Sequence, residues 1–402
     1  MPKVSVVIPV YNAARFLPQC LDSLCSQTYQ DMEILCVNDG STDCSLEILE
    51  EYGAKDKRIR IFSKKNEGRG AASARNLGLE HAEGTYVQFV DSDDFFEPDM
   101  VQALVEKAEK VNADVVVCRA DCYDEALGKT VGEFRTIELE RRPEKDPFSF
   151  RDCPERIFHI GEGITWNKLY RRSLLEQYDL KYEAIPITDD HYVALLSLVF
   201  AERITCVDRV LVHYRMNTGQ SQCDTRARHP EGAYAASYSI VARLREAGIY
   251  ETVKRGYLNL AVRLMRVYFD QMTDYQTLRS LHDTYRDEMF PLLDAVDLPE
   301  DYFFDPRLGE WYRMVISHSL EEILFMAARG YGCEMTTAVL RFPAPFDRVR
   351  KGSRIVLVGR GMAGRYWYVQ FLLSGHCEVV CWVDREEHIS PELSFDSIII
   401  AK

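Results

Sequence analysis

The hydrophobic positions of residues 1–120 alternate between short apolar runs and apolar residues at helical spacing. Runs rich in β-branched residues, without polar alternation, are typical of strands buried on both faces. The sequence predicts such strands over Val4–Ile8, Ile34–Val37, Arg58–Phe62, Tyr86–Val90 and Val115–Val117. Helical spacing between them predicts helices over 15–26, 41–53, 70–81 and 98–111. Regular alternation of strands and helices predicts an α/β fold with a mainly parallel sheet that is covered on both faces.

Polar residues follow each of the first four predicted strands. Because ligands of parallel sheets bind at the carboxyl ends of the strands, we expect these residues to converge on one crevice. They are Pro9, Tyr11, Asn12, Asp39, Asn66, Asp91, Asp93 and Asp94. A nucleotide accounts for the set, since Tyr11 can stack on a base and Asp39 can accept the imino N–H of uracil or thymine. Asp91 can then accept hydrogen bonds from ribose hydroxyls.

The acidic cluster after the fourth strand, Asp91-Ser92-Asp93-Asp94, has two interpretations. Carboxylates this close repel one another unless a cation or a hydrogen-bonding ligand compensates them. One interpretation is a divalent metal that Asp93 holds between the phosphates of a substrate. The other is a solvated turn before a helix, with Asp94 or Asp99 as a cap. If the site is functional, we expect Asp94 toward the acceptor side and Arg75 near the nucleotide or a phosphate.

Four ordered motifs over the first hundred residues resemble those of family 2 glycosyltransferases, which have the nucleotide-diphospho-sugar-binding GT-A fold. The motifs are Val6–Asn12, Val37–Asp43, Ala74–Gly78 and Phe89–Asp94. The resemblance implies transfer of a sugar from a UDP-sugar or similar donor to a hydroxyl acceptor, with inversion of the anomeric centre. It also implies Mg²⁺ or Mn²⁺ as cofactor. Asn38 departs from the family, which more often has a second aspartate there.

A second acidic cluster, Thr188-Asp189-Asp190-His191, precedes another helical pattern. The resemblance implies that Asp190 is the general base, and that Asp189 replaces a more usual glutamate. Such a group is needed because the attacking sugar hydroxyl must lose its proton. Alternatively, both aspartates cap the following helix. His191 is interpreted as a bystander.

Two further segments resemble parts of the family's catalytic domain. Thr165–Arg172 resembles a connection back to the active site, and we interpret it as a positioning element without a catalytic role. Leu211–Ser221 resembles the strand and loop that close the donor site. In it, His213 is expected to complete the metal shell or contact the diphosphate, with a buried structural histidine as the alternative. Arg215 is expected to face the diphosphate.

The predicted domains are a GT-A catalytic domain over 1–225, a helical region over 226–342 and a Rossmann-like βαβ unit over 350–402. Pro343-Ala344-Pro345 is expected to be a linker. The last unit carries Gly-x-Gly-x-x-Gly over Gly359–Gly364 after one strand, and Asp384 after the next, which is a dinucleotide fingerprint. NAD(P) binding and a degenerate or shortened structural unit both remain open. A homodimer interface in the helical region is also open.

The net charge and the composition limit the classes of binding partner and the cellular location that we expect. The 402 residues include 49 Lys+Arg and 63 Asp+Glu, for a net charge of −14, which argues against general nucleic-acid or anionic-lipid binding. The 12 scattered cysteines are expected to be reduced thiols. With no signal peptide and no apolar run of about 20 residues, a cytoplasmic location is expected, and peripheral attachment to the inner face of the membrane stays open.

The function expected from the sequence is therefore a metal-dependent inverting glycosyltransferase. Its acceptor would be a carbohydrate or a lipid-linked sugar, in surface polysaccharide or glycolipid synthesis. One alternative is a catalytically inactive regulatory protein that binds a nucleotide sugar or NAD. A nucleotidyltransferase is disfavoured because Pro9–Ala13 offers no glycine-rich basic loop for a triphosphate.

Overall fold

The computed structural model of the chain divides into two compact units, Met1–Leu264 and Met265–Lys402. The division falls inside helix α9 (Tyr250–Gln271), so the helical region expected from residue 226 contributes to both units. The structure describes residues 2–68, 70–134, 138–218, 228–272, 274–299, 301–329, 348–358, 367–368, 371, 377–383 and 394–400.

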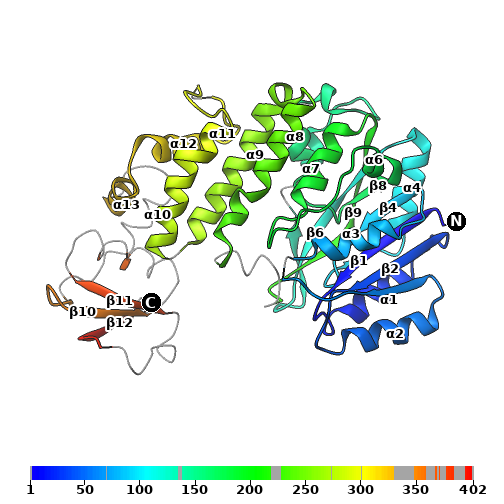
Figure 1. Ribbon diagram of the computed structural model, residues 1–402, viewed down its shortest axis with the longest axis horizontal. Helices are drawn as coiled ribbons and strands as arrows, with labels where there is room; N and C mark the ends of the chain where they lie inside the picture. Colours follow the sequence, from blue (N-terminus) through cyan, green and yellow to red (C-terminus); the bar gives the residue numbers. More distant parts are fainter. Residues whose placement is uncertain are drawn as a thin grey trace. The chain divides into compact units, whose positions relative to one another are not determined.

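The first half of the main sheet is parallel, as the sequence predicts. Its strands are β1 (Val4–Val10), β2 (Met32–Asn38), β3 (Ile59–Ser63) and β4 (Tyr86–Phe89). They lie in the order β3-β2-β1-β4, of which Figure 1 labels β2, β1 and β4. The strands β1 and β2 are buried along their whole length. All four carboxyl ends therefore lie at the same edge of the sheet.

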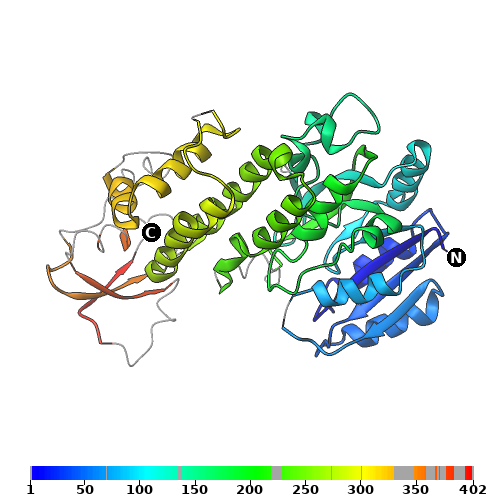
Figure 2. The ribbon, with the colours of Figure 1, turned by 45° about the horizontal axis from the view of Figure 1, so that its top comes forward.

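Helices cover both faces of these strands. They are α1 (Leu17–Cys25), α2 (Ser45–Lys55), α3 (Ala72–Glu80) and α4 (Met100–Val111). Gly53 of α2 packs on Ile61, while Gly78 of α3 packs so closely on Val7 that a Cβ would overlap it. The registers place Ile61 and Val7 on opposite faces, because side chains alternate along a strand. Figure 2 shows the blue strands between the helices.

The second half of the sheet is mixed, which differs from a simple parallel continuation. Its strands are β5 (Phe95–Phe96), β6 (Val115–Asp124), β7 (Lys129–Glu133), β8 (Lys168–Arg171) and β9 (Ile204–Met216). β8 lies antiparallel between β4 and β6, and its Leu169 and Tyr170 are fully buried there. β9 runs parallel to β6, and β5 pairs with β9, so the chain just after the acidic turn lies beside residues 212–213.

The remaining elements of this unit are mainly helical. They are the short helices η1 (Leu139–Arg141), η2 (Phe150–Asp152) and η4 (Pro230–Ala233), and α5 (Ile157–Gly161), α6 (Arg172–Gln177), α7 (His191–Phe200) and α8 (Ala235–Glu246). α7 is buried from Val193 to Phe200 and packs on α5, α6 and α8. Among the residues that the structure describes, no helix has the length and hydropathy required to span a membrane.

The second unit contains helices followed by a small sheet. The helices are α10 (Tyr275–Thr284), a π-helical turn (Tyr285–Met289), α11 (Phe290–Leu292), α12 (Pro306–Ser317) and α13 (Leu320–Arg329). The strands are β10 (Arg354–Val358), β11 (Glu378–Val383) and β12 (Ser397–Ile400), all parallel in the order β11-β10-β12. The parallel pairing agrees with a partial Rossmann-like unit. The expected linker at Pro343–Pro345, the glycine motif Gly359–Gly364 and Asp384 lie outside the described residues.

Candidate functional site

The ends of β2 and β3 bring Asp39, Lys64 and Asn66 together. Lys64 Nζ donates to Asp39 Oδ1 at 2.9 Å, and Asn66 Nδ2 donates to Asp39 Oδ2 at 3.0 Å. Gly40 permits this approach, because its φ is +68° and a Cβ would lie 2.8 Å from the Asn66 nitrogen. The carboxylate oxygens of Asp39 each keep a second lone pair for a ligand. The sequence did not assign Lys64, although it directly follows a strand that ends at this edge.

The residues at the end of β1 have different surroundings. Tyr11 is 53% exposed, so its ring can serve as a stacking surface. Asn12 instead forms hydrogen bonds with the neighbouring loop. Its Oδ1 accepts from the backbone nitrogen of Thr42 at 2.8 Å, and its backbone nitrogen donates to Ser41 Oγ at 3.1 Å. Pro9 is buried within β1 beside Val37. The geometry thus differs from the expected direct contacts of the Asn12 and Pro9 side chains with substrate.

Arg75 joins the two acidic clusters. Its NH1 donates to Asp189 Oδ2 at 2.9 Å and its NH2 to Asp91 Oδ1 at 2.7 Å. The guanidinium also lies over the Tyr182 ring at 5.2 Å, and Arg75 is only 6% exposed. The sequence interpretation placed Arg75 against the nucleotide or a phosphate, but these hydrogen bonds commit it to two carboxylates of the protein. Its geometry is that of a residue that positions Asp91 and Asp189.

Asp190 is the N-cap residue of α7, yet its side chain makes no capping hydrogen bond. Burial and the neighbouring charge of Asp189 raise the pKa of Asp190 to about 7. Asp189 itself is buried, and its carboxylate is paired with Arg75. The alternative interpretation, in which both aspartates cap the helix, therefore does not describe their side chains. A carboxylate with a pKa near neutrality is suited to accept and release a proton.

Asp93 has the surroundings of a carboxylate that a cation would stabilise. Burial and the charge of Asp91 raise its pKa to about 6. Within the described part of the chain, no three His, Cys, Asp or Glu side chains form a group that could hold a metal ion by themselves. Mg²⁺ is commonly bound by one or two carboxylates together with substrate phosphates, and Asp93 is the carboxylate expected to contribute to such a site.

Asp94 does not lie where the sequence interpretation placed it. It is fully buried, and its Oδ1 accepts from the backbone nitrogen of Arg215 at 2.9 Å. Burial and the charges of Asp93 and Asp91 raise its pKa well above the ordinary value. A buried carboxyl of this kind ties β9 to the acidic turn and has no surface to offer an acceptor.

Arg215 is also enclosed by the protein. Its Nε donates to the Asp93 carbonyl oxygen at 2.7 Å, one NH2 donates to Gln19 Oε1 at 2.7 Å, and Glu125 pairs with the other. The guanidinium lies over three aromatic rings, those of Phe16, Phe95 and Tyr123. Arg215 is 3% exposed, so the expected position facing a diphosphate is corrected to one that supports the acidic turn.

His213 has both ring nitrogens engaged by carboxylates. Nδ1 lies 2.8 Å from Asp121 Oδ1, and Nε2 lies 3.2 Å from Glu97 Oε1. The ring stacks on Phe95 at 4.6 Å. In this arrangement neither nitrogen is directed to a metal at Asp93, so the structural alternative describes His213 better. The following segment Gly219–Ser221 lies outside the described residues.

Lys168 is a buried charge that sequence reasoning passed over. It has no exposed surface, and its ammonium donates to Asn167 Oδ1 at 2.9 Å and to the carbonyl oxygens of Gly161 and Ile164. Burial lowers its pKa to about 7, against the attraction of Asp190 and Glu162. The sequence interpretation took Thr165–Arg172 as a positioning segment, and Lys168 within it gave no local signal that its charge would be internal.

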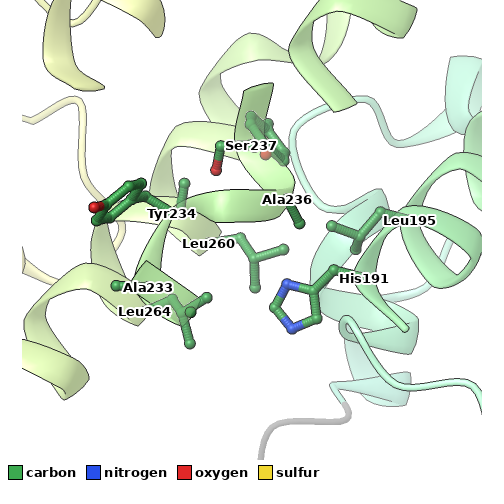
Figure 3. A pocket seen from close by; sticks show the side chains of 11 residues that line it. His191, Leu195, Ala233, Tyr234, Ala236, Ser237, Leu260 and Leu264 are labelled. Atoms are coloured by element: carbon green, nitrogen blue, oxygen red, sulfur yellow. The ribbon is translucent and has the colours of Figure 1, made fainter. Parts of the chain in front are cut away.

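A small, mainly apolar hollow lies beside the N-terminal end of α7. Figure 3 shows the His191 ring directed into it, opposite Leu260 and Leu264. Its other lining residues are Leu195, Gly232, Ala233, Tyr234, Ala236, Ser237, Tyr257 and Ala261. His191 directly follows Asp190, and it lies so close to Gly163 that a Cβ there would come within 2.6 Å of its ring.

Known proteins are similar to this chain in sequence and in fold. The family model described as glycosyl transferase family 2 matches residues 5–179. The uncharacterized glycosyltransferase YibD of Escherichia coli is 32% identical over 289 residues, which cover 70% of this chain and 78% of that protein. The chain belongs to glycosyl transferase family 2.

One further relative of this family 2 chain and one solved structure of similar fold show how far the similarity extends. The uncharacterized glycosyltransferase EpsJ of Bacillus subtilis is 36% identical over 222 residues, which cover 54% of this chain and only 62% of that protein. The structure of TarS residues 1–349 from S. aureus, solved in complex with UDP-GlcNAc, aligns with a TM-score of 0.53 at 19% identity. That alignment covers 78% of this chain and 92% of the other, and it shows a shared fold.

Proposed function

We propose that the chain is a glycosyltransferase that moves a sugar from a UDP-sugar to a hydroxyl acceptor, with inversion at the anomeric carbon. The observation that carries the proposal is the bridge from Arg75 to Asp91 and Asp189. It joins the strand-end cluster, which suits a nucleotide, to the loop that carries a carboxylate suited to proton transfer. Membership of family 2 and the UDP-GlcNAc complex of TarS support the choice of a sugar nucleotide.

The donor would bind along the carboxyl edge of β3-β2-β1-β4. Asp39 would accept the imino N–H of uracil, with its carboxylate oriented by hydrogen bonds from Lys64 and Asn66. The exposed ring of Tyr11 would stack on the base. Asp91 is 28% exposed and uses one oxygen for Arg75, which leaves the other available for a ribose hydroxyl.

The acceptor hydroxyl would attack the anomeric carbon from the side opposite the diphosphate. The new oxygen–carbon bond forms as the bond between that carbon and the diphosphate oxygen breaks, and UDP leaves with the bonding electron pair. Asp190 would accept the hydroxyl proton, which its carboxylate can do because its pKa lies near neutrality. A single displacement of this kind inverts the anomeric configuration.

A divalent metal, Mg²⁺ or Mn²⁺, would be held by Asp93 and would neutralise charge that develops on the departing diphosphate. The protein contributes the rigid turn that presents Asp93. Arg215 fixes this turn through the Asp93 carbonyl oxygen, and Asp94 fixes it through the backbone nitrogen of Arg215. His213 lies in the neighbouring strand pair, where two carboxylates hold its ring.

The proposed acceptor is a carbohydrate or lipid-linked hydroxyl, as in surface polysaccharide or glycolipid synthesis. The proposal is tested by incubating the protein with UDP-, dTDP- and GDP-sugars, with and without Mn²⁺, and measuring the melting temperature and nucleotide release. We expect the largest metal-dependent rise with a UDP-sugar, accompanied by slow UDP release into water. Stabilisation without any UDP release, even with sugar acceptors added, would favour the inactive nucleotide-sugar-binding alternative.

A further inference from the structure

Among the residues that the structure describes, the buried ammonium of Lys168 has hydrogen bonds only to uncharged oxygens. Its acceptors are the Gly161 and Ile164 carbonyl oxygens and Asn167 Oδ1. A charge buried without a paired carboxylate costs free energy, because burial removes its hydration. Nothing in the proposed reaction uses this residue directly, since it has no exposed surface from which to reach a substrate.

The loop 161–164, whose carbonyl oxygens accept hydrogen bonds from Lys168, packs against the first residue of α7. A Cβ at Gly161 would come within 2.8 Å of Lys168 Cε, and a Cβ at Gly163 would come within 2.6 Å of the His191 ring. The loop 161–164 therefore contacts the Lys168 ammonium at Gly161 and Ile164, and it contacts His191 at Gly163. His191 directly follows Asp190 in the sequence. Displacing the ammonium would loosen the support of the base.

We propose that Lys168 is a positioning residue for Asp190: it fixes the loop next to α7 and supplies a buried positive charge that favours the ionised carboxylate. This inference rests on the proposed role of Asp190 as the base. Of the charges that act on Lys168, that of Asp190 is the largest, ahead of Glu162, and the thiols of Cys118 and Cys206 follow. Glu162 is paired with Arg263, whose NH2 donates to Glu162 Oε1 at 2.6 Å and to Oε2 at 2.7 Å.

Three other charged groups are the main charges that act on the pKa of Asp190. Asp189 and Asp91 both disfavour the ionised form of Asp190, whereas Arg75 favours it. Arg75, however, already donates to both of those carboxylates. Because an interaction between two charges is reciprocal, Lys168 and Asp190 should titrate as a coupled pair, and removing one should change the titration of the other.

The test is the pH dependence of turnover in Lys168→Met, which keeps the buried stem and removes the charge. With a UDP-sugar as substrate, we expect the midpoint of the acid limb to rise by about one pH unit, which means a rate about tenfold lower at low pH. Arg171→Met is the matched control on the same strand, because Arg171 pairs with Asp114 and Asn112 rather than with Asp190. An unchanged midpoint in a folded Lys168→Met protein would overturn the proposal.

A second measurement needs no catalysis and works on the wild-type protein. The ¹³C carboxyl signal of Asp190, assigned by comparison with Asp190→Asn, is followed by NMR as the pH is raised, together with the ¹⁵Nζ signal of Lys168. We expect both signals to change over the same neutral pH range. A Lys168 that stays fully charged beyond pH 9, or an Asp190 that titrates in one step below pH 5, would refute the pairing. Coupled titration without turnover of any nucleotide sugar would refute only the proposed function.

Discussion

Asp91 and Asp189 share the guanidinium of Arg75, at 2.7 and 2.9 Å, although Asp91 follows β4 and Asp189 precedes α7. One buried cation therefore ties the strand-end cluster to the loop that carries Asp190. If Arg75 is replaced, two carboxylates lose their partner in a place where water cannot replace it fully. The geometry of the site thus depends on a residue that we do not expect to touch the substrate.

Arg75→Ala should lower the free energy of unfolding by about 3–5 kcal/mol, because it leaves the buried carboxylate of Asp189 and the partly buried carboxylate of Asp91 uncompensated. Urea denaturation at neutral pH measures this loss. Lys55→Ala is the control, since Lys55 forms an exposed pair with Glu51 on α2 and should change stability little. Equal effects of the two substitutions would contradict the role of Arg75 in joining the clusters.

Asp39→Ala should weaken binding of UDP about 10- to 100-fold, because a charge-assisted hydrogen bond to the base is removed. The preference for UDP over CDP should disappear as well, since cytosine lacks the proton that Asp39 accepts. Isothermal titration calorimetry with both nucleotides measures this. Glu47→Ala, on the exposed face of α2, serves as the control. A variant that still prefers UDP would show that Asp39 does not read the base.

Asp93→Asn and His213→Gln separate the two predicted metal ligands. We expect Asp93→Asn to remove the dependence of UDP binding on Mn²⁺, because its carboxylate is the proposed metal ligand. His213→Gln should keep that dependence, because the ring nitrogens bond to Asp121 and Glu97. Titrating Mn²⁺ at fixed UDP measures both. Loss of the metal dependence in His213→Gln alone would reverse the assignment.

The raised pKa of Asp190 also predicts how stability varies with pH. The ordinary pKa of 3.8 is raised to about 7 in the folded protein, so folding favours the protonated form. The resulting stabilisation is present at low pH and is lost as the pH rises toward 7. Asp190→Asn cannot ionise, so its free energy of unfolding should increase relative to the wild type between pH 5 and pH 8. A constant difference across that range would contradict the raised pKa.

The sequence predicted the edge of the sheet well because the signals there are local. An apolar run that stops at Asp91 and Asp93, or at Asp39, reports both the strand and the polar residues after it. Arg75 and Asp189 are 114 positions apart, and their pairing follows from tertiary packing alone. The same is true of Arg215, whose charge is enclosed by three rings from separate segments, and of β8, which enters the sheet antiparallel.

The most direct test of the proposed function is Asp190→Asn, assayed for UDP release from a UDP-sugar and for UDP binding. If Asp190 accepts the acceptor's proton, turnover should fall about 10²- to 10⁴-fold, in the range of general-base catalysis. Affinity for UDP should stay within about twofold of the wild type, because the nucleotide contacts lie at the strand ends. Retained turnover, or a parallel loss of turnover and UDP binding, would contradict the assignment of Asp190 as the base.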